Sequence, residues 1–574
     1  MAVIALSRVR RPAEGSASPE LMALRQHVDQ RIVGLRTDRY SWWQHWRLIA
    51  EYLIPRRYKW LITPNEGQRG SPINQRIVNN TGTIALRVQS SGLMSGLTSP
   101  GKPWFDLDTG DDDLDEDPDV KTWLSEVQKR MSRVFAESNF YDAIATMDQD
   151  LGWAGSGPIV VYEDFEDVIR LVNWACGEYY LANGPRLTVD TGYREFVLTV
   201  LQVAEEFGLE NCSDTIRGAI ETGGAGLMRE VRVGHAIEAN TGLLPGAPGV
   251  DGMPWREIYW ELGSGRNFIL RIRGYHERPF VAPRWDVIGN DAYGRSPAMD
   301  ALGDIRSLQV MEKRKAQAID KHVNPPMVAD IALKNEPASL LPGGVTYVTN
   351  TGVGFKPAYE VAPDFAGLAN EIARTEQRIK DTFFNDLFLM ISQLDTVRTA
   401  TEIDARQEEK LIQLGPVIER FENEALDPII MRTYSIMLRG GLLPPMPQTM
   451  KGKQPRIKYT SMLAQAQRAV STAAIERWAA FVGNIMGADP NAIDNVDVDE
   501  TIREYADLLG VDPRLVRAAS KVKLIRAQKA QAAQAQAAQA QTMANVQGAQ
   551  TLSQTDVGGG VNALQLMTGR GAPQ

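Results

Sequence analysis

The segment 96–103, GLTSPGKP, has the spacing of a phosphate-binding loop, in which backbone N–H groups and a lysine cradle nucleotide phosphates. Pro103 stands where Ser or Thr would hold magnesium, and neither Pro100 nor Pro103 has an N–H group to offer. The segment also follows a predicted helix, whereas a phosphate-binding loop follows a strand. We therefore interpret it as a turn that delivers Trp104 and Phe105 to the core.

Two charged runs could bind ions. The acidic run 111–117, DDDLDED, carries the carboxylates that calcium prefers, but it lacks the glycine and the terminal glutamate of an EF-hand loop. The basic run 313–315 could meet phosphate, yet consecutive helical positions point in different directions, and Glu312 and Asp320 lie nearby. A solvated surface is the simpler interpretation of both runs.

Catalytic and metal-binding patterns do not stand out elsewhere. Two cysteines, Cys176 and Cys212, exclude a disulfide framework. The five histidines are far apart: His27, His45, His235, His276 and His322. We find no Ser/His/Asp set, paired-carboxylate spacing or zinc-ligand spacing, so the residues predict no catalytic site, no metal site and no cofactor.

Composition and charge narrow the function further. A chain of 574 residues exceeds one hydrophobic core, and no apolar run reaches the 18 or so residues that span a membrane. The N-terminus does not read as a secretory signal, so we expect synthesis in the cytoplasm. The net charge is −9, but residues 513–574 carry seven basic and one acidic residue, which leaves −15 for the rest. A mostly acidic body repels a phosphate backbone rather than gripping it.

Two long helical stretches bracket a proline-framed insert. The first covers 296–323, the insert 325–359 and the second 368–388. Helices of about 25 residues, each near 38 Å long, would form a stalk with a small tip. Five apolar positions share one face of the second stretch: Leu368, Ile372, Ile379, Phe383 and Leu387. We expect neighbouring subunits to cover this face, in a protein that stands beside copies of itself.

The remaining elements surround this stalk. Helical patterns before 154 and short β-branched or aromatic runs between 158 and 283 predict one mixed α+β domain over 19–295. The polar stretch 391–399 precedes a helix that starts at a capping box, Thr399 to Glu402, and should kink at Gly415-Pro416. A strand near 454–463 and further helices follow, ending in an Ala/Gln-rich helix that needs neighbours.

Five segments in this order resemble the head-to-tail connecting (portal) proteins of short-tailed, podovirus-type phages. They are 79–107, 293–309, 398–410, 457–469 and 497–517. The resemblance covers most of the chain. It implies an α+β, mostly helical portal fold that assembles as a ring, typically dodecameric, around an axial channel at one capsid vertex.

The resemblance also implies a division into regions. These are a flexible N-terminus (1–18), an α+β wing (19–295), stem helix 1 (296–324), a clip (325–365), stem helix 2 (366–390), a channel or tunnel loop (391–399), a kinked channel helix (400–438), a return to the wing (439–484), a crown (485–524), an Ala/Gln-rich barrel helix (525–557) and a disordered tail (558–574).

The implied function is to nucleate capsid assembly, dock the terminase motor, pass DNA during packaging and ejection, and anchor the tail. The implied partners are copies of the chain, the large terminase subunit, capsid and scaffolding proteins, a tail adaptor or nozzle, internal ejection proteins, and double-stranded DNA that passes through non-specifically. The resemblance implies no membrane insertion and no cofactor. It implies a location at the head–tail junction of the virion, after synthesis in the host cytoplasm.

Candidate site residues follow from these regions. In an acidic channel DNA slides, because no phosphate is held tightly, while a few basic side chains keep it centred. The candidates for this role are Arg374, Arg378, Lys380 and Arg398, each of which could instead form an ion pair between subunits. The channel loop is Leu394, Asp395, Thr396 and Val397. Clip residues for docking the motor or adaptor are Pro326, Lys334, Asn335 and Glu336.

Two alternatives belong to other classes. A packaging ATPase or nuclease would need an intact phosphate-binding loop or a carboxylate metal cluster. A non-portal tail or adaptor protein would usually be shorter and would lack the helix–clip–helix core.

Overall fold

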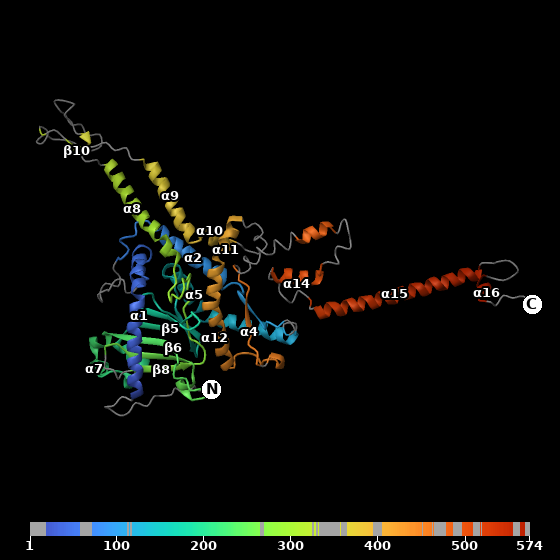
Figure 1. The fold of residues 1–574 in the computed structure, drawn as a ribbon, viewed down its shortest axis with the longest axis horizontal. Coiled ribbons are helices and arrows are strands. Elements are labelled where there is room, and N and C mark those ends of the chain that lie inside the picture. Colours follow the sequence, from blue (N-terminus) through green and yellow to red (C-terminus); the bar gives the residue numbers. More distant parts are fainter. Residues whose placement is uncertain are drawn as a thin grey trace, which may run out of the picture. The chain divides into compact units, whose positions relative to one another are not determined.

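The computed structural model describes residues 19–568 with gaps at 58–71, 112–113, 115–116, 264–268, 324–326, 329–330, 332–355, 358–363, 394–404, 451, 462, 464–477, 486–495, 509–516, 518 and 555–562. The chain divides into two compact units, Met1–Gln467 and Arg468–Gln574 (Figure 1). Within the described ranges, no helix has the length and apolar character needed to cross a bilayer. The predicted α+β, mostly helical fold is confirmed.

The described part of the first unit begins with the helices α1 (Pro19–Tyr52), α2 (Thr81–Leu97), α4 (Pro118–Glu137) and α5 (Phe140–Ala154). They account for the helical patterns that the sequence shows before 154. The acidic run leads into α4, where the Asp117 side chain accepts a hydrogen bond from the Asp119 N–H. An N-terminal carboxylate of this kind satisfies a free donor and suits the helix dipole.

Residues 179–275 contain an antiparallel five-stranded sheet, called the wing sheet below. In spatial order its strands are β4 (Tyr179–Asn183), β5 (Val189–Thr199), β6 (Glu230–Ala239), β7 (Trp255–Glu261) and β8 (Ile269–Tyr275). A three-stranded sheet in the order β3 (Val168–Asn173), β2 (Ile159–Asp164) and β9 (Phe280–Val281) lies beside it. The prediction of short strands between 158 and 283 is confirmed.

Helices cover both faces of the five-stranded sheet because its strands alternate apolar side chains. On β7, Ile258 and Trp260 pack with Val28 and Ile32 of α1, whereas Tyr259 packs on the opposite face. That opposite face is covered by α6 (Val200–Phe207) and α7 (Asp214–Thr222), which the sequence did not predict. Short 3₁₀ turns are η1 (Leu209–Asn211), η2 (Gly224–Met228), η3 (Gly249–Gly252) and η8 (Gln448–Met450).

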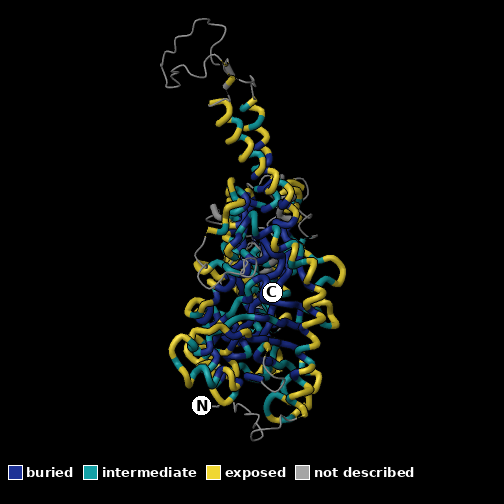
Figure 2. Tube along the Cα trace, turned by 90° about the vertical axis from the view of Figure 1, so that its left-hand side faces the viewer, coloured by how far each residue is buried: buried dark blue, intermediate teal, exposed yellow. Residues whose placement is uncertain are grey.

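The predicted stalk is present. Helices α8 (Pro297–Val323) and α9 (Phe365–Thr382) pack side by side, and their exposed ends project from the body of the unit (Figure 2). Beyond them, β10 (Met327–Val328) pairs antiparallel with β11 (Lys356–Pro357), so the chain leaves and returns at the same place. The second stretch is not one helix, however, because α9 ends at Thr382 and α10 (Asn385–Gln393) follows as a separate helix.

The apolar face of this stretch is covered by the chain itself. Ile372 is 5% exposed, and Ile379, Phe383 and Leu387 are fully buried. The first three pack with side chains of α2 and α8, and Leu387 packs with the end of α2. The expectation that neighbouring subunits cover this face is therefore wrong: two helices of the same chain do so.

The long helix that follows the channel-loop region has three parts: α11 (Ala405–Phe421), the π-helix η7 (Glu422–Leu426) and α12 (Asp427–Arg439). Helix α11 runs through Pro416, so the irregular turn is not at the expected position. Pro428 accounts for the position of the π-helix η7. A proline lacks an N–H group and crowds the carbonyl four residues earlier, here that of Glu424. The Asp427 N–H instead donates to the Glu422 carbonyl, five residues back. The expected capping box at Thr399 lies outside the described residues.

The chain then pairs with a strand from the first part of the unit. Strand β12 (Arg456–Tyr459) confirms the predicted strand near 454–463, and it pairs antiparallel with β1 (Phe105–Asp108). Trp104 and Phe105 are 3% and 1% exposed, which confirms that the turn before them delivers both rings to the core.

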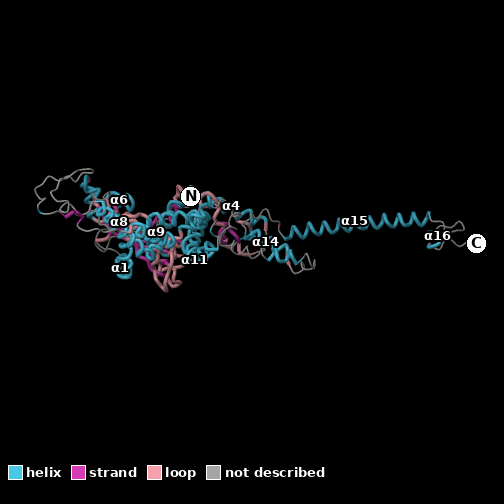
Figure 3. Tube along the Cα trace, turned by 90° about the horizontal axis from the view of Figure 1, so that it is seen from above, coloured by secondary structure: helices cyan, strands magenta, loops and turns pink. Residues whose placement is uncertain are grey.

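The second unit is helical where it is described. It contains a helix at 478–485, then α14 (Val498–Leu508), α15 (Ala519–Gln554) and α16 (Ala563–Met567). The Ala/Gln-rich segment is part of α15, one uninterrupted helix of 36 residues (Figure 3). Its side chains are exposed almost throughout, including Leu524 and Met543. The tail that the sequence predicts to be disordered contains α16.

Candidate functional site

The base of the stalk is tied to the start of α2 through one turn. Gln309 of α8 accepts hydrogen bonds from the Val78 and Asn79 N–H groups at 2.7 and 2.8 Å, and donates to the Asn79 carbonyl. The Asn79 side chain donates to Glu376 of α9 at 2.8 Å and to Glu312 of α8 at 3.3 Å. This turn therefore holds both stalk helices at once. It belongs to the segment 79–107 that carries the family resemblance, although spacing alone did not indicate its role.

Two of the candidate basic residues lie on one side of α9. Arg378 donates to Asp304 of α8 at 3.1 Å, and Arg374 and Arg378 lie 4.0 and 3.9 Å from Glu371. The bond to Asp304, together with its charge, raises the pKa of Arg378. The Arg374 side chain is 77% exposed and that of Arg378 is 51% exposed. Arg378 thus links the two stalk helices, and Arg374 remains available to solvent.

The other candidates are placed differently or are not described. Lys380 lies six positions after Arg374, which puts it about 120° around the helix. It is half-buried, and no described residue forms an ion pair with it. Arg398, the channel-loop residues Leu394 to Val397, and the clip residues lie outside the described residues. Those clip residues are Pro326, Lys334, Asn335 and Glu336.

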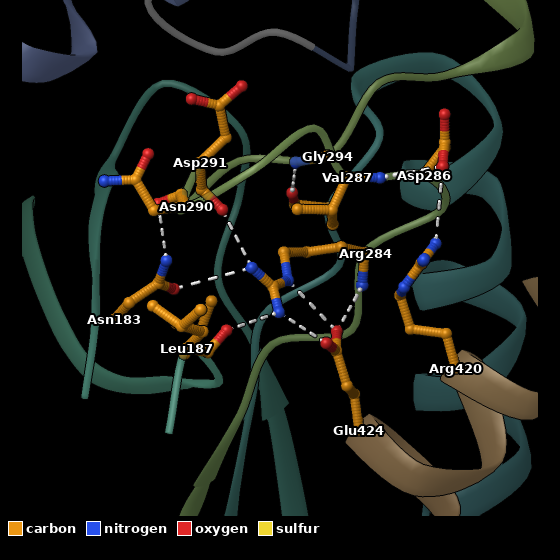
Figure 4. A network of polar contacts seen from close by, with 12 residues as sticks. Asn183, Leu187, Arg284, Asp286, Val287, Asn290, Asp291, Gly294, Arg420 and Glu424 are labelled. Atoms are coloured by element: carbon orange, nitrogen blue, oxygen red, sulfur yellow. Dashed lines mark hydrogen bonds and ion pairs between the residues drawn. The ribbon is translucent and has the colours of Figure 1, made fainter. Parts of the chain in front are cut away.

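The π-helix η7 is joined to the loop before α8 through a buried ion pair (Figure 4). Arg284 lies in the loop between β9 and α8. Its backbone N–H and guanidinium donate to both carboxylate oxygens of Glu424 in η7, at 2.5 to 3.2 Å. The same guanidinium donates to the Asp291 and Leu187 carbonyls at 2.8 and 3.0 Å. Arg420 adds a bond to the Trp285 carbonyl at 2.9 Å.

This joint fixes η7 against the element that leads into α8. The Arg284 side chain is 4% exposed and that of Glu424 is 11% exposed. On the far side of η7, the buried Arg432 of α12 donates to the Val161 carbonyl of β2 at 2.9 Å and to the Glu277 carbonyl at 3.1 Å. The π-helix is therefore held by the loop before α8 through Arg284, and the helix that follows it is held by β2 through Arg432. Because the partners are remote in sequence, no spacing rule could have indicated them.

A second buried network lies inside the wing sheet. Glu257 accepts hydrogen bonds from the hydroxyls of Tyr162 and Tyr275 at 2.7 Å, and from His235 Nε2 at 2.7 Å. His235 Nδ1 accepts from Arg194 at 3.0 Å, which makes the imidazole neutral with its proton on Nε2. Burial lowers the pKa of His235 to about 4, although the bond to Glu257 opposes the shift. Burial alone would raise the pKa of Glu257, but these donors outweigh it and lower the pKa to about 2.

The enzyme-like segments behave as ordinary structure. The segment 96–103 is the end of α2 and the turn after it, with Thr98 as the helix cap. Asp111 pairs with Lys453 at 2.9 Å. Among the described residues, no group of histidine, cysteine and carboxylate side chains could hold a metal ion.

Comparison with known proteins identifies the family. The model of the bacteriophage head to tail connecting protein family matches residues 25–516. The chain belongs to this family. The head-to-tail connecting proteins it resembles include the portal protein of Salmonella phage epsilon15, with 41% identity over 554 residues, covering 96% of this chain and 99% of that protein. The probable portal protein of Bordetella phage BPP-1 is 42% identical over 499 residues, covering 86% and 89%.

A solved neck of an empty GTA particle, computed with C6 symmetry, matches with a TM-score of 0.32 and 12% identity. The match covers 69% of this chain and 86% of that one, but it is too weak to carry an argument. Family membership makes this chain a phage portal, or head-to-tail connector, subunit, whose role is structural. Such a subunit works as a ring at the head–tail junction of the virion, between capsid and tail.

Proposed function

We propose that this connector subunit forms the ring through which the packaging motor, docked at the stalk tip, drives double-stranded DNA into the capsid. The same ring nucleates shell assembly with capsid and scaffolding proteins, and later connects to a tail adaptor or nozzle and to the ejection proteins. The observation that carries the proposal is the two-helix stalk, α8 and α9, which closes at its tip in the β10–β11 pair.

The stalk tip is the proposed docking surface for the large terminase subunit. Ile331, just beyond β10, is 86% exposed, and Val328 within β10 is 54% exposed. Exposed apolar side chains at the end of a projecting stalk offer contact area to a partner. The clip residues Pro326, Lys334, Asn335 and Glu336 complete this surface in the proposal.

The proposed DNA path uses few positive charges. Arg374 is the most exposed of the candidate cations on α9, and Arg378 is engaged with Asp304. With Lys380 and Arg398, Arg374 would centre the duplex, and the loop 394–397 would touch it. A mostly acidic body would leave DNA free to slide, because phosphates are held only where positive charge is concentrated.

We propose further that the ring hydrolyses no nucleotide, so the work comes from a separate motor. The turn after α2 supports this, because Pro100 and Pro103 withhold two of the N–H groups that a phosphate-binding loop supplies.

The test uses purified full-length protein and the large terminase subunit. Mass photometry and electron micrographs should show closed rings, which we expect to contain about ten to fourteen subunits, because one repeated interface can close on itself. Ile331→Asp should leave the rings intact and weaken motor binding at least tenfold. Ile288→Asp places the same charge at a 61% exposed isoleucine of the body and should leave binding unchanged. A monomer at micromolar concentration would contradict the ring, and equal binding by both variants would contradict tip docking.

A further inference from the structure

The break between α9 and α10 interrupts an apolar face that the sequence continues. Residues 368–393 contain neither glycine nor proline. Ile372, Ile379, Phe383 and Leu387 are spaced by seven, four and four residues, so their apolar face stays in phase across the break. This periodicity favours one continuous helix, whereas the residues at the break, 381–386 (DTFFND), are weak helix formers.

The backbone at the break is strained. Phe384 has φ of 55°, in the left-handed region where a side chain with a Cβ costs about 1–2 kcal/mol. Two other described non-glycine residues have positive φ, Val168 and Leu187, and both lie at β-hairpins. The Phe384 N–H donates to the Asp381 carbonyl at 3.0 Å, a bond three residues back that tightens the last turn of α9.

Tertiary packing holds the bend. Gly92 of α2 lets Phe388 approach its backbone so closely that a Cβ there would lie 2.3 Å from the Phe388 Cβ. Phe388 is 1% exposed, and the Phe384 ring lies 6.4 Å from that of Trp285. These contacts stabilise the bent chain, because they bury apolar surface that a straight continuation of α9 would leave unburied.

The bent state also leaves buried polar groups without partners. Within the described chain, no hydrogen-bond partner reaches the Asn385 Oδ1 of α10, either amide atom of Gln89 on α2, or either carboxyl oxygen of Asp148 on α5. These side chains are 4%, 0% and 1% exposed, and α2 packs against both α5 and α10. An unpaired buried polar group costs about 1–3 kcal/mol. Strain and unpaired groups therefore oppose the packing that favours the bend.

We propose that Phe383-Phe384 is a two-state hinge: the bent state of this structure exchanges with a state in which α9 and α10 form one helix. Straightening removes the left-handed residue and carries α10 away from α2. The role of the hinge rests on the proposed function, since α10 leads from the stalk into the channel-loop region. The two states themselves are a property of the chain.

The hinge is measured by a distance between spin labels at Arg374→Cys and Leu389→Cys, both at exposed positions. The native Cys176 and Cys212 are buried, so the labels go to the introduced residues. Labelled subunits are diluted with unlabelled ones, so that each ring carries one pair. A continuous helix places the two Cα atoms about 22 Å apart, and a bend shortens this distance. The unmodified hinge should give both distances.

A matched pair of variants shifts the two states in opposite directions. Phe384→Ala and Phe384→Gly remove the same ring, but alanine favours the helix and glycine tolerates positive φ. The ratio of continuous to bent chains should be about fivefold higher in the alanine variant. One distance shared by all three proteins would overturn the hinge, even with rings and packaging intact. If the variants fail to assemble, the test rests on the protein with the native Phe384. A single spin-label distance in that protein would also overturn the hinge. Absence of rings in the unmodified protein would instead contradict the proposed function. The spin-label distances could then still be measured on the unassembled subunit, so the hinge would be tested separately.

Discussion

Arg284 and Glu424 form a buried ion pair that joins the loop leading into the stalk to the π-helix between α11 and α12. The arginine guanidinium also donates hydrogen bonds to the Leu187 and Asp291 carbonyls. Its N–H groups therefore bind both η7 and the loops around Leu187 and Asp291. A movement of η7 relative to this loop must strain or break the pair. The pair therefore fixes η7 to the loop that leads into α8.

Removing one member of this pair should be costly. Glu424→Ala leaves a buried guanidinium without its counter-charge, and we expect a loss of about 3–5 kcal/mol in the free energy of unfolding. Chemical denaturation followed by tryptophan fluorescence measures it. Glu126→Ala is the control, because Glu126 and Arg130 form an exposed pair, 45% and 42% accessible, whose loss should cost about 1 kcal/mol or less. Equal losses in the two variants would contradict the assigned role of the joint.

The exposed cation on α9 should matter for DNA and not for folding. Arg374→Glu should leave the ring and its melting temperature unchanged, and reduce packaged DNA severalfold in a packaging assay, because a negative charge would face the phosphates. Lys313→Glu makes the same charge change at an exposed position of α8 and should package normally. If both variants package alike, Arg374 does not line the channel.

Acid should destabilise the wing through His235 and Glu257. Both have lowered pKa values in the folded chain, about 4 and about 2, so the unfolded chain binds more protons and stability falls as pH falls. The histidine contributes between pH 6.5 and 4, on the order of 1–3 kcal/mol, and the glutamate adds a second loss below about 4.5. Melting temperatures across this range test it. His235→Gln should flatten the upper step, and His322→Gln, at an exposed histidine, should retain it.

Deletion of Leu394 to Val397 tests the channel loop, which lies outside the described residues. Rings and procapsids should form normally, whereas DNA retention or completion of packaging should fall, because the loop would touch DNA at the axis. Loss of ring assembly would instead make the segment a structural joint, and normal packaging with normal retention would make it a simple connector.

The turn after α2 provides a test for enzymatic activity. Lys102→Ala should support normal packaging when a motor is supplied, and purified rings should not hydrolyse ATP, because the prolines withhold phosphate-binding N–H groups. Loss of packaging by Lys102→Ala rings of normal assembly would revive the ATPase interpretation.

The parts of the fold that the sequence predicted well depend on neighbouring residues. Pro325 and Pro326 stop a helix because proline withholds an N–H, and α8 ends at Val323. Alternating apolar residues gave β5 to β8, because a strand places successive side chains on opposite faces. Local sequence also predicted the two-helix stalk and the Ala/Gln-rich helix, and it carried the family resemblance.

Tertiary structure decided what depends on remote residues. Helix α9 ends at Thr382, and α10 is placed where Phe388 packs against Gly92, almost 300 positions earlier, a contact that the apolar periodicity of the stretch does not indicate. The apolar face of α9 was visible in the sequence, but only the fold shows that α2 and α8 of the same chain cover it. Arg284 and Glu424 are 140 positions apart, and no periodicity relates them. Local preferences act over a few residues, whereas burial and ion pairing depend on distance in space, which only the folded chain defines.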